Sequence, residues 1–164
     1  MESDSQSLIF SNFALQWCQC LRNLSQELYR VLGAGGQLVF AVPGPETLIE
    51  LGQAWAQVDN NIHVHHFASL QDWQQAFVET GFSRIDLRTD KLPEQHGSVR
   101  ELLMALKAMG AHNNNAGKPS GMTGKQKLKS LYNAYEQYRL PNGNLPATWQ
   151  IISGTVIKQS TTFY

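Results

Sequence analysis

Polar and aromatic side chains follow directly after the first apolar run of the chain. Leu8-Ile9-Phe10 is expected to form a buried strand. Four side chains with hydrogen-bonding or aromatic groups come next: Ser11, Asn12, Gln16 and Trp17. Ligands of open α/β sheets bind beyond the carboxyl ends of the strands, so these side chains could contact a small molecule. The residues leave another interpretation open, in which Asn12 caps a turn and Trp17 belongs to the core.

The chain offers two other groups of possible metal ligands, the histidines His63, His65 and His66 and the cysteines Cys18 and Cys20. No carboxylate or Cys stands at a spacing that would complete a zinc site around the histidines, so a polar loop is the expected structure. The cysteines are separated by one residue, which is too close for an ordinary disulfide. We therefore expect no metal site, two reduced thiols and a cytoplasmic protein.

Charge is balanced over the whole chain, with thirteen Lys and Arg against thirteen Asp and Glu. This balance predicts no general attraction to nucleic acid or to an anionic membrane, and no apolar run is long enough to span a bilayer. A local basic region stands out, made of Arg100, Lys107, Lys118, Lys125, Lys127 and Lys129. It could attract an acidic partner, or it could be an ordinary solvated helix face.

The spacing of apolar residues predicts helices alternating with strands, which is the pattern of an α/β fold. Helices are expected at 21–32, 48–58, 69–81, 99–106 and 128–138, and strands at 8–10, 38–42, 83–89 and 149–157. The first helix, closed by a glycine turn at 33–36, joins the first two strands in a parallel β-α-β unit. Ser69 and Asp72 fit a capping box. We expect one domain, 1–164, with a helical insert at about 97–140.

Several segments resemble class I methyltransferases, which use S-adenosylmethionine. The stretch 7–17 is similar to their fourth strand and the loop after it, and the stretch 28–36 is similar to the helix and glycine turn that lead to their fifth strand. One branch, the malonyl-[acyl-carrier protein] methyltransferases of biotin synthesis, is resembled most closely by residues 11–17, 110–115, 121–124 and 145–149. The resemblance covers most of the chain and implies an incomplete Rossmann-like sheet built from strands 4 to 7 of the family.

Members of this family transfer a methyl group from S-adenosylmethionine to the free carboxyl of malonyl on acyl carrier protein. The resemblance implies that the first loop borders the methionine end of the cofactor through Ser11, Asn12, Ala14 and Leu15. It also implies that Asn12 and Gln16 donate hydrogen bonds in this site and that Trp17 forms a wall of it. It implies contacts with the substrate or its acidic carrier from Gln16, Trp17, Arg100, His112, Asn113 and Lys125. An asparagine-rich turn is an equally simple interpretation of 112–115. Because a carboxylate is already ionised near neutral pH, no acid-base dyad is expected and no catalytic residue is assigned.

The sequence departs from the family in one respect, since its 164 residues contain no Gly-x-Gly-x-Gly loop of the kind that binds a nucleotide. The glycines at 33–36 precede a strand, whereas a nucleotide loop follows one. At about 30 residues per β-α-β unit, roughly 90 residues of preceding β-α units are expected to be absent. We therefore expect a C-terminal part of a methyltransferase that is inactive alone.

Absent strands would leave Leu8 to Phe10 as an open apolar edge, which invites pairing with another chain. A homodimer through this edge and a complementing N-terminal polypeptide both fit the sequence, and a truncated gene product or a fragment of a longer protein fits it equally well. Two other functions stay open. One is a non-catalytic remnant that dimerises or binds acyl carrier protein, and the other is a class I methyltransferase for another small acid.

Overall fold

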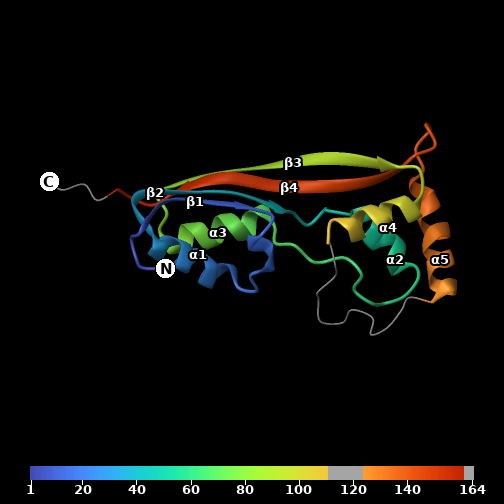
Figure 1. Ribbon diagram of the computed structural model, residues 1–164, viewed down its shortest axis with the longest axis horizontal. Coiled ribbons are helices and arrows are strands. Elements are labelled where there is room, and N and C mark those ends of the chain that lie inside the picture. The colour runs from blue at the N-terminus through green and yellow to red at the C-terminus, as the bar shows by residue number, and fades with distance from the viewer. Residues whose placement is uncertain (111–123, 161–164) are drawn as a thin grey trace. The chain divides into compact units, whose positions relative to one another are not determined.

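The computed structural model describes residues 1–110 and 124–160 (Figure 1). Its elements are β1 (Gln6–Asn12), η1 (Leu15–Trp17), α1 (Leu21–Val31), β2 (Leu32–Pro43), α2 (Ile49–Ala56), α3 (Leu70–Thr80), β3 (Arg84–His96), α4 (Val99–Ala108), α5 (Lys125–Tyr135), η2 (Glu136–Tyr138) and β4 (Leu145–Ile157). The chain forms two compact units. The sheet unit comprises Met1–Pro45, Phe67–Asp90 and Gln150–Tyr164, and the helical unit comprises Glu46–His66 and Lys91–Trp149. Among the described residues, no helix is long and apolar enough to cross a membrane.

The four strands form one mixed sheet in the order β1-β2-β4-β3. β1 runs parallel to β2, with Ile9 opposite Leu38, which confirms the predicted β-α-β unit. β4 runs antiparallel to β2, with Gly154 opposite Phe40. A side chain at Gly154 would not fit, because its Cβ atom would lie 2.2 Å from the carbonyl oxygen of Asp86 on β3. The last strand of the chain therefore lies closely packed between β2 and β3.

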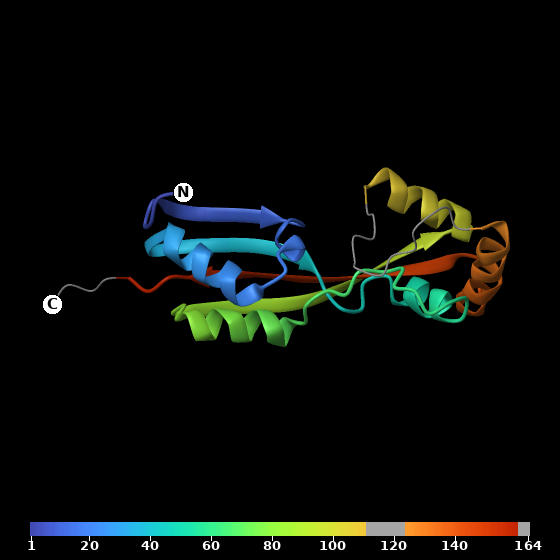
Figure 2. The ribbon, with the colours of Figure 1, turned by 90° about the horizontal axis from the view of Figure 1, so that it is seen from below.

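Helices α1 and α3 cover one face of the sheet (Figures 1 and 2). Phe40 of β2 is buried against Trp73 and Phe77 of α3, with ring centroids 5.2 and 5.6 Å apart. The buried hydroxyl of Ser25 on α1 donates a hydrogen bond to the carbonyl of Ala76 on α3 at 3.0 Å. Aromatic packing and this polar contact together hold the two helices on the sheet.

The opposite face of β1 is exposed. Successive side chains of a strand point to opposite faces, so Ile9 packs on the core beneath the helices while Leu8 and Phe10 point away from it. Leu8 and Phe10 are 57% and 72% exposed. The expectation of a buried strand is therefore wrong for these two side chains. β1 lies at one edge of the four-stranded sheet, and this position agrees with the expected open apolar edge.

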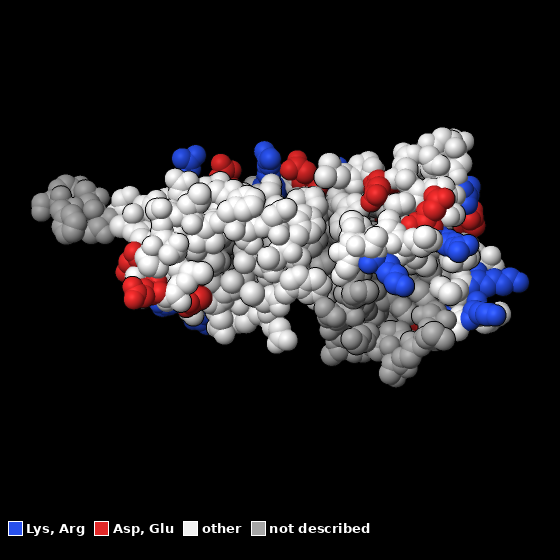
Figure 3. All heavy atoms as spheres, viewed as in Figure 1, with Lys and Arg blue, Asp and Glu red and all other residues white. Residues whose placement is uncertain are grey.

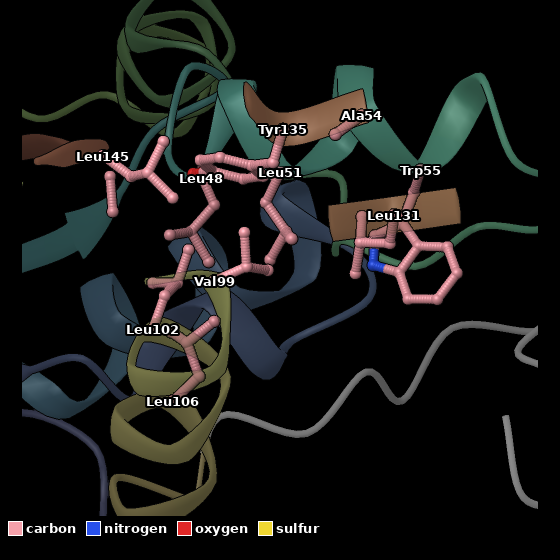
Figure 4. Packing of buried hydrophobic residues seen from close by; sticks show 11 residues of the cluster. Leu48, Leu51, Ala54, Trp55, Val99, Leu102, Leu106, Leu131, Tyr135 and Leu145 are labelled. Atoms are coloured by element: carbon pink, nitrogen blue, oxygen red, sulfur yellow. The ribbon is translucent and has the colours of Figure 1, made fainter. Parts of the chain in front are cut away.

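The helical unit has a core of its own, formed by α2, α4, α5 and the start of β4 (Figure 4). Leu51 of α2, Leu102 of α4 and Leu131 of α5 are buried in it. The hydroxyl of Tyr135 donates a hydrogen bond to the carbonyl of Pro146 at 2.9 Å. Burial, with a smaller contribution from the charge of Glu50, raises the pKa of this hydroxyl. One side of α4 packs on this core, and its other side is exposed.

The position of α3 was predicted correctly from its capping residues. The hydroxyl of Ser69 accepts a hydrogen bond from the N–H of Asp72, and the Asp72 carboxylate accepts one from the N–H of Ser69, which confirms the capping box. The helix ends at Gly81, whose φ of 95° is a left-handed conformation that suits glycine.

Two strands are longer than expected. β2 begins at Leu32, directly after α1, because Gln6 of β1 pairs with this residue. The glycines at 33–36 therefore belong to the strand and do not form a separate turn. β3 continues from Arg84 past Pro93 to His96, whereas alternation in the sequence indicated a strand only as far as Thr89.

Candidate functional site

The loop after β1 lies at the carboxyl ends of two parallel strands. Phe13 adopts a left-handed conformation, with a φ of 51°, and its N–H donates a hydrogen bond to the carbonyl of Ala41 on β2 at 2.9 Å. This bond holds the start of the loop beside the end of β2, and η1 follows at once. The loop from Ser11 to Trp17 therefore lies where parallel α/β sheets bind their ligands.

Two buried polar atoms of this loop have no hydrogen-bond partner among the described residues, namely Oγ of Ser11 and Oε1 of Gln16. Ser11 is 8% exposed. Gln16, expected to be a hydrogen-bond donor to a ligand, uses its Nε2 group to donate to the carbonyl of Phe13 at 2.7 Å. A buried polar group without a partner costs about 1–3 kcal/mol. A ligand that bonds to both atoms would remove this cost, with the serine donating or accepting and the Gln16 oxygen accepting.

The other candidates in the loop differ in exposure. Asn12 is exposed, and its side chain makes no hydrogen bond in the described part of the chain, so nothing there supports a turn-capping role. Trp17 is 47% exposed, so its interpretation as a core residue is wrong. Ala14 is exposed, and Leu15 is half-buried against the core of the sheet unit. The indole of Trp17 therefore lies partly on the surface beside the loop.

The remaining candidates belong to the helical unit. Arg100 is exposed on α4, and Lys125 is the exposed first residue of α5. His112 and Asn113 lie outside the described residues.

Sequence reasoning missed a polar cluster in the helical unit. Oδ1 of Asp59 lies 2.7 Å from Nε2 of His63, and its Oδ2 accepts a hydrogen bond from Nζ of Lys127 at 2.7 Å. The hydrogen bond from Lys127, followed by the one with His63, holds the pKa of Asp59 well below its usual range. From the sequence, carboxylates near the histidines were considered only as metal ligands, and this hydrogen bond between Asp59 and His63 was not anticipated. The four-residue separation between Asp59 and His63 was the available signal.

Asp59, His63 and Lys127 form a hydrogen-bonded cluster. No group of three His, Cys, Asp or Glu side chains close enough to hold a metal ion occurs within residues 1–110 and 124–160. The ring of His63 stacks on Trp55, so its position is fixed by packing as well as by Asp59.

Comparison with known proteins identifies relatives of the chain, although no family model matches it. The chain is 38% identical over 154 residues to the malonyl-[acyl-carrier protein] O-methyltransferase of Gallionella capsiferriformans, a match that covers 94% of this chain and 53% of that protein. It is 40% identical over 147 residues to the biotin biosynthesis bifunctional protein BioHC of Cellvibrio japonicus, covering 90% of this chain and 29% of that protein.

A solved structure shares the fold. A candidate methyltransferase of Bacillus halodurans C-125 superposes on 98% of this chain and 67% of its own with a TM-score of 0.60, at 15% sequence identity. The predicted α/β class is confirmed, and the four-stranded mixed sheet matches part of the fold of that candidate methyltransferase. The chain spans about half the length of several curated methyltransferases that it matches. Over nine-tenths of its own length, it is homologous to the malonyl-[acyl-carrier protein] O-methyltransferases.

Proposed function

We propose that the chain supplies the substrate side of an S-adenosylmethionine-dependent methyltransferase that methylates the free carboxyl of malonyl-acyl-carrier protein in biotin biosynthesis. The observation that carries the proposal is the 38% identity to a malonyl-[acyl-carrier protein] O-methyltransferase over 94% of the chain. The loop from Ser11 to Trp17 supports it, because its buried partnerless atoms lie at a ligand-binding position of the sheet. We place the reaction in the cytoplasm, where thiols such as Cys18 and Cys20 stay reduced.

Methyl transfer to a carboxylate depends on alignment and on exclusion of water, because the nucleophile is already ionised near neutral pH. S-adenosylmethionine supplies an electrophilic methyl group when it is bound. The hydroxyl of Ser11 would donate a hydrogen bond to a carboxylate, and Oε1 of Gln16 would accept one from an ammonium or hydroxyl group. The indole of Trp17 would shield the reacting carboxylate from water. No proton transfer is required of these residues.

The loop fits one end of the cofactor only. The free atoms of Ser11 and Gln16 suit the charged groups of its amino-acid end. The nucleotide end needs backbone N–H groups at a glycine-rich turn before a helix, and the 164 residues contain no Gly-x-Gly-x-Gly sequence. We therefore propose that the chain alone does not complete the reaction. In the complete enzyme, further β-α units would pair with the edge strand β1.

A chimeric enzyme tests this function. The part of the Gallionella capsiferriformans relative that matches this chain is replaced by the chain itself, and methyl transfer to malonyl-acyl-carrier protein is measured. We expect activity within about tenfold of the parent enzyme, because homologous halves preserve the site geometry. A folded chimera that binds S-adenosylhomocysteine but methylates no malonyl-carrier contradicts the proposal.

The exposed edge of β1 favours a second function, a non-catalytic module that associates through this edge or binds acyl carrier protein. The same chimera distinguishes the two, since a lineage that had lost catalysis would yield a folded, cofactor-binding and inactive enzyme. Activity on another small acid, with none on malonyl-carrier, would instead indicate a different methyltransferase.

A further inference from the structure

The outward face of α4 combines an exposed apolar side chain with two cations. Val99, Leu102 and Leu106 are buried, and residues three, four and seven apart share one face of a helix. Arg100, Met104 and Lys107 therefore line the outward side together, and Met104 is 60% exposed. Methionine is flexible and polarisable, which suits it to adaptable contact surfaces.

The sequence of α4 and of the stretch that follows it is mostly basic. Between residues 97 and 135, the sequence carries six basic residues and one acidic residue, Glu101. The carboxylate of Glu101 accepts a hydrogen bond from the N–H of Gly97 at 2.9 Å, so it serves the amino end of the helix. Within the described residues, neither Arg100 nor Lys107 takes part in an ion pair. Figure 3 shows Lys and Arg side chains, with Asp and Glu side chains among them, on the surface around α4 and α5.

We propose that the Arg100–Met104–Lys107 face of α4 docks an acidic surface of the acyl carrier protein. This inference rests on the proposed function for the identity of the partner. The two cations complement carboxylates on such a surface and speed its encounter, while Met104 contacts an apolar side chain between them. The balanced charge of the whole chain favours no polyanion in general.

The test measures binding of fluorescently labelled malonyl-acyl-carrier protein to the full chain by anisotropy, at low and at high salt. The docking variant is Arg100→Glu with Lys107→Glu, and Met104→Ser is measured separately. The matched control is Arg22→Glu with Arg84→Glu, which makes the same change in net charge at exposed residues of the sheet unit. Circular dichroism checks that each variant is folded.

We expect the double reversal at α4 to weaken binding at least tenfold at low salt, and the control to change it less than threefold. Met104→Ser is expected to weaken binding at both salt concentrations, because an apolar contact is not screened. If the α4 reversal and the control weaken carrier binding equally, the docking proposal is wrong. If the chimera still methylates malonyl-acyl-carrier protein in that case, the proposed function is unaffected. An absence of any carrier binding by the wild-type chain would overturn the docking proposal as well. If the α4 reversal alone weakens carrier binding and the chimera is inactive, the docking proposal is supported and the methyltransferase function is rejected.

Discussion

The imidazole of His63 lies flat on the indole of Trp55, with ring centroids 3.7 Å apart and planes 6° from parallel. The same imidazole is hydrogen-bonded to Asp59, whose second carboxylate oxygen binds Lys127 on α5. Because Lys127 belongs to the first turn of α5, this contact joins the segment after α2 to that helix. The cluster therefore stabilises the core of the helical unit from its surface.

Replacing Asp59 by Asn is expected to lower the melting temperature in a pH-dependent way. The pKa of Asp59 is depressed in the folded chain, so its stabilisation is complete above the ordinary carboxyl pKa of about 3.9 and is lost as pH falls through the lower folded-state value. The melting-temperature difference between wild type and Asp59→Asn should be largest near neutral pH and should shrink in acid.

Thermal unfolding of both proteins over a pH series provides the measurement. The control is Asp86→Asn, which replaces an exposed carboxylate on β3. A difference for Asp59→Asn that stays constant from neutral pH to pH 2 would contradict the role of its charge.

Replacing Ser11 by Ala is expected to change stability little and to lower methyl transfer. The hydroxyl is buried without a partner in the described chain, so its removal should change the free energy of unfolding by less than about 1 kcal/mol, or increase stability. In the chimeric enzyme the same substitution should lower methyl transfer about tenfold, as expected for a lost hydrogen bond to a ligand. Urea unfolding and the methylation assay measure the two effects. Strong destabilisation with unchanged activity would show that the hydroxyl has a structural role.

Replacing Gly154 by Ala is expected to destabilise the sheet. The added Cβ atom would lie 2.2 Å from the carbonyl oxygen of Asp86, and overpacking of this kind costs about 1–3 kcal/mol or more. Gly124→Ala is the control, because its Cβ would meet nothing within 4 Å. Denaturant unfolding should show a large loss for the first variant and almost none for the second. Equal stabilities would mean that β3 and β4 are not packed this closely.

Replacing both Leu8 and Phe10 by Lys is expected to leave the fold intact and to abolish association through β1. Both side chains are more than half exposed, so their loss removes little core packing, while charged side chains discourage pairing at an edge strand. Analytical ultracentrifugation should show concentration-dependent association of the wild-type chain and a monomeric variant. A wild-type chain that stays monomeric at high concentration would contradict the association of two copies through β1.

Much of the fold could be predicted from local sequence patterns. The capping residues Ser69 and Asp72 and the terminal Gly81 lie within one helix, so their spacing alone was enough to place α3. The order of the sheet could not be predicted, because the position of β4 depends on pairing between residues far apart, such as Phe40 and Gly154.

The candidate site was predictable in position but not in detail. Resemblance placed the loop after β1, whereas the exposure of Trp17 and the local hydrogen bond of Gln16 depend on the left-handed turn at Phe13. The contact between Asp59 and Lys127 joins residues 68 positions apart, and no local pattern reveals it.

Titration of the purified chain with S-adenosylhomocysteine in a calorimeter tests the central claim most directly, namely that this chain carries the substrate side of a methyltransferase without a nucleotide-binding loop. The account predicts no measurable heat of binding for the chain alone and clear binding by the chimeric enzyme. Micromolar binding by the chain alone would contradict it, because a complete cofactor site would then be present within these 164 residues.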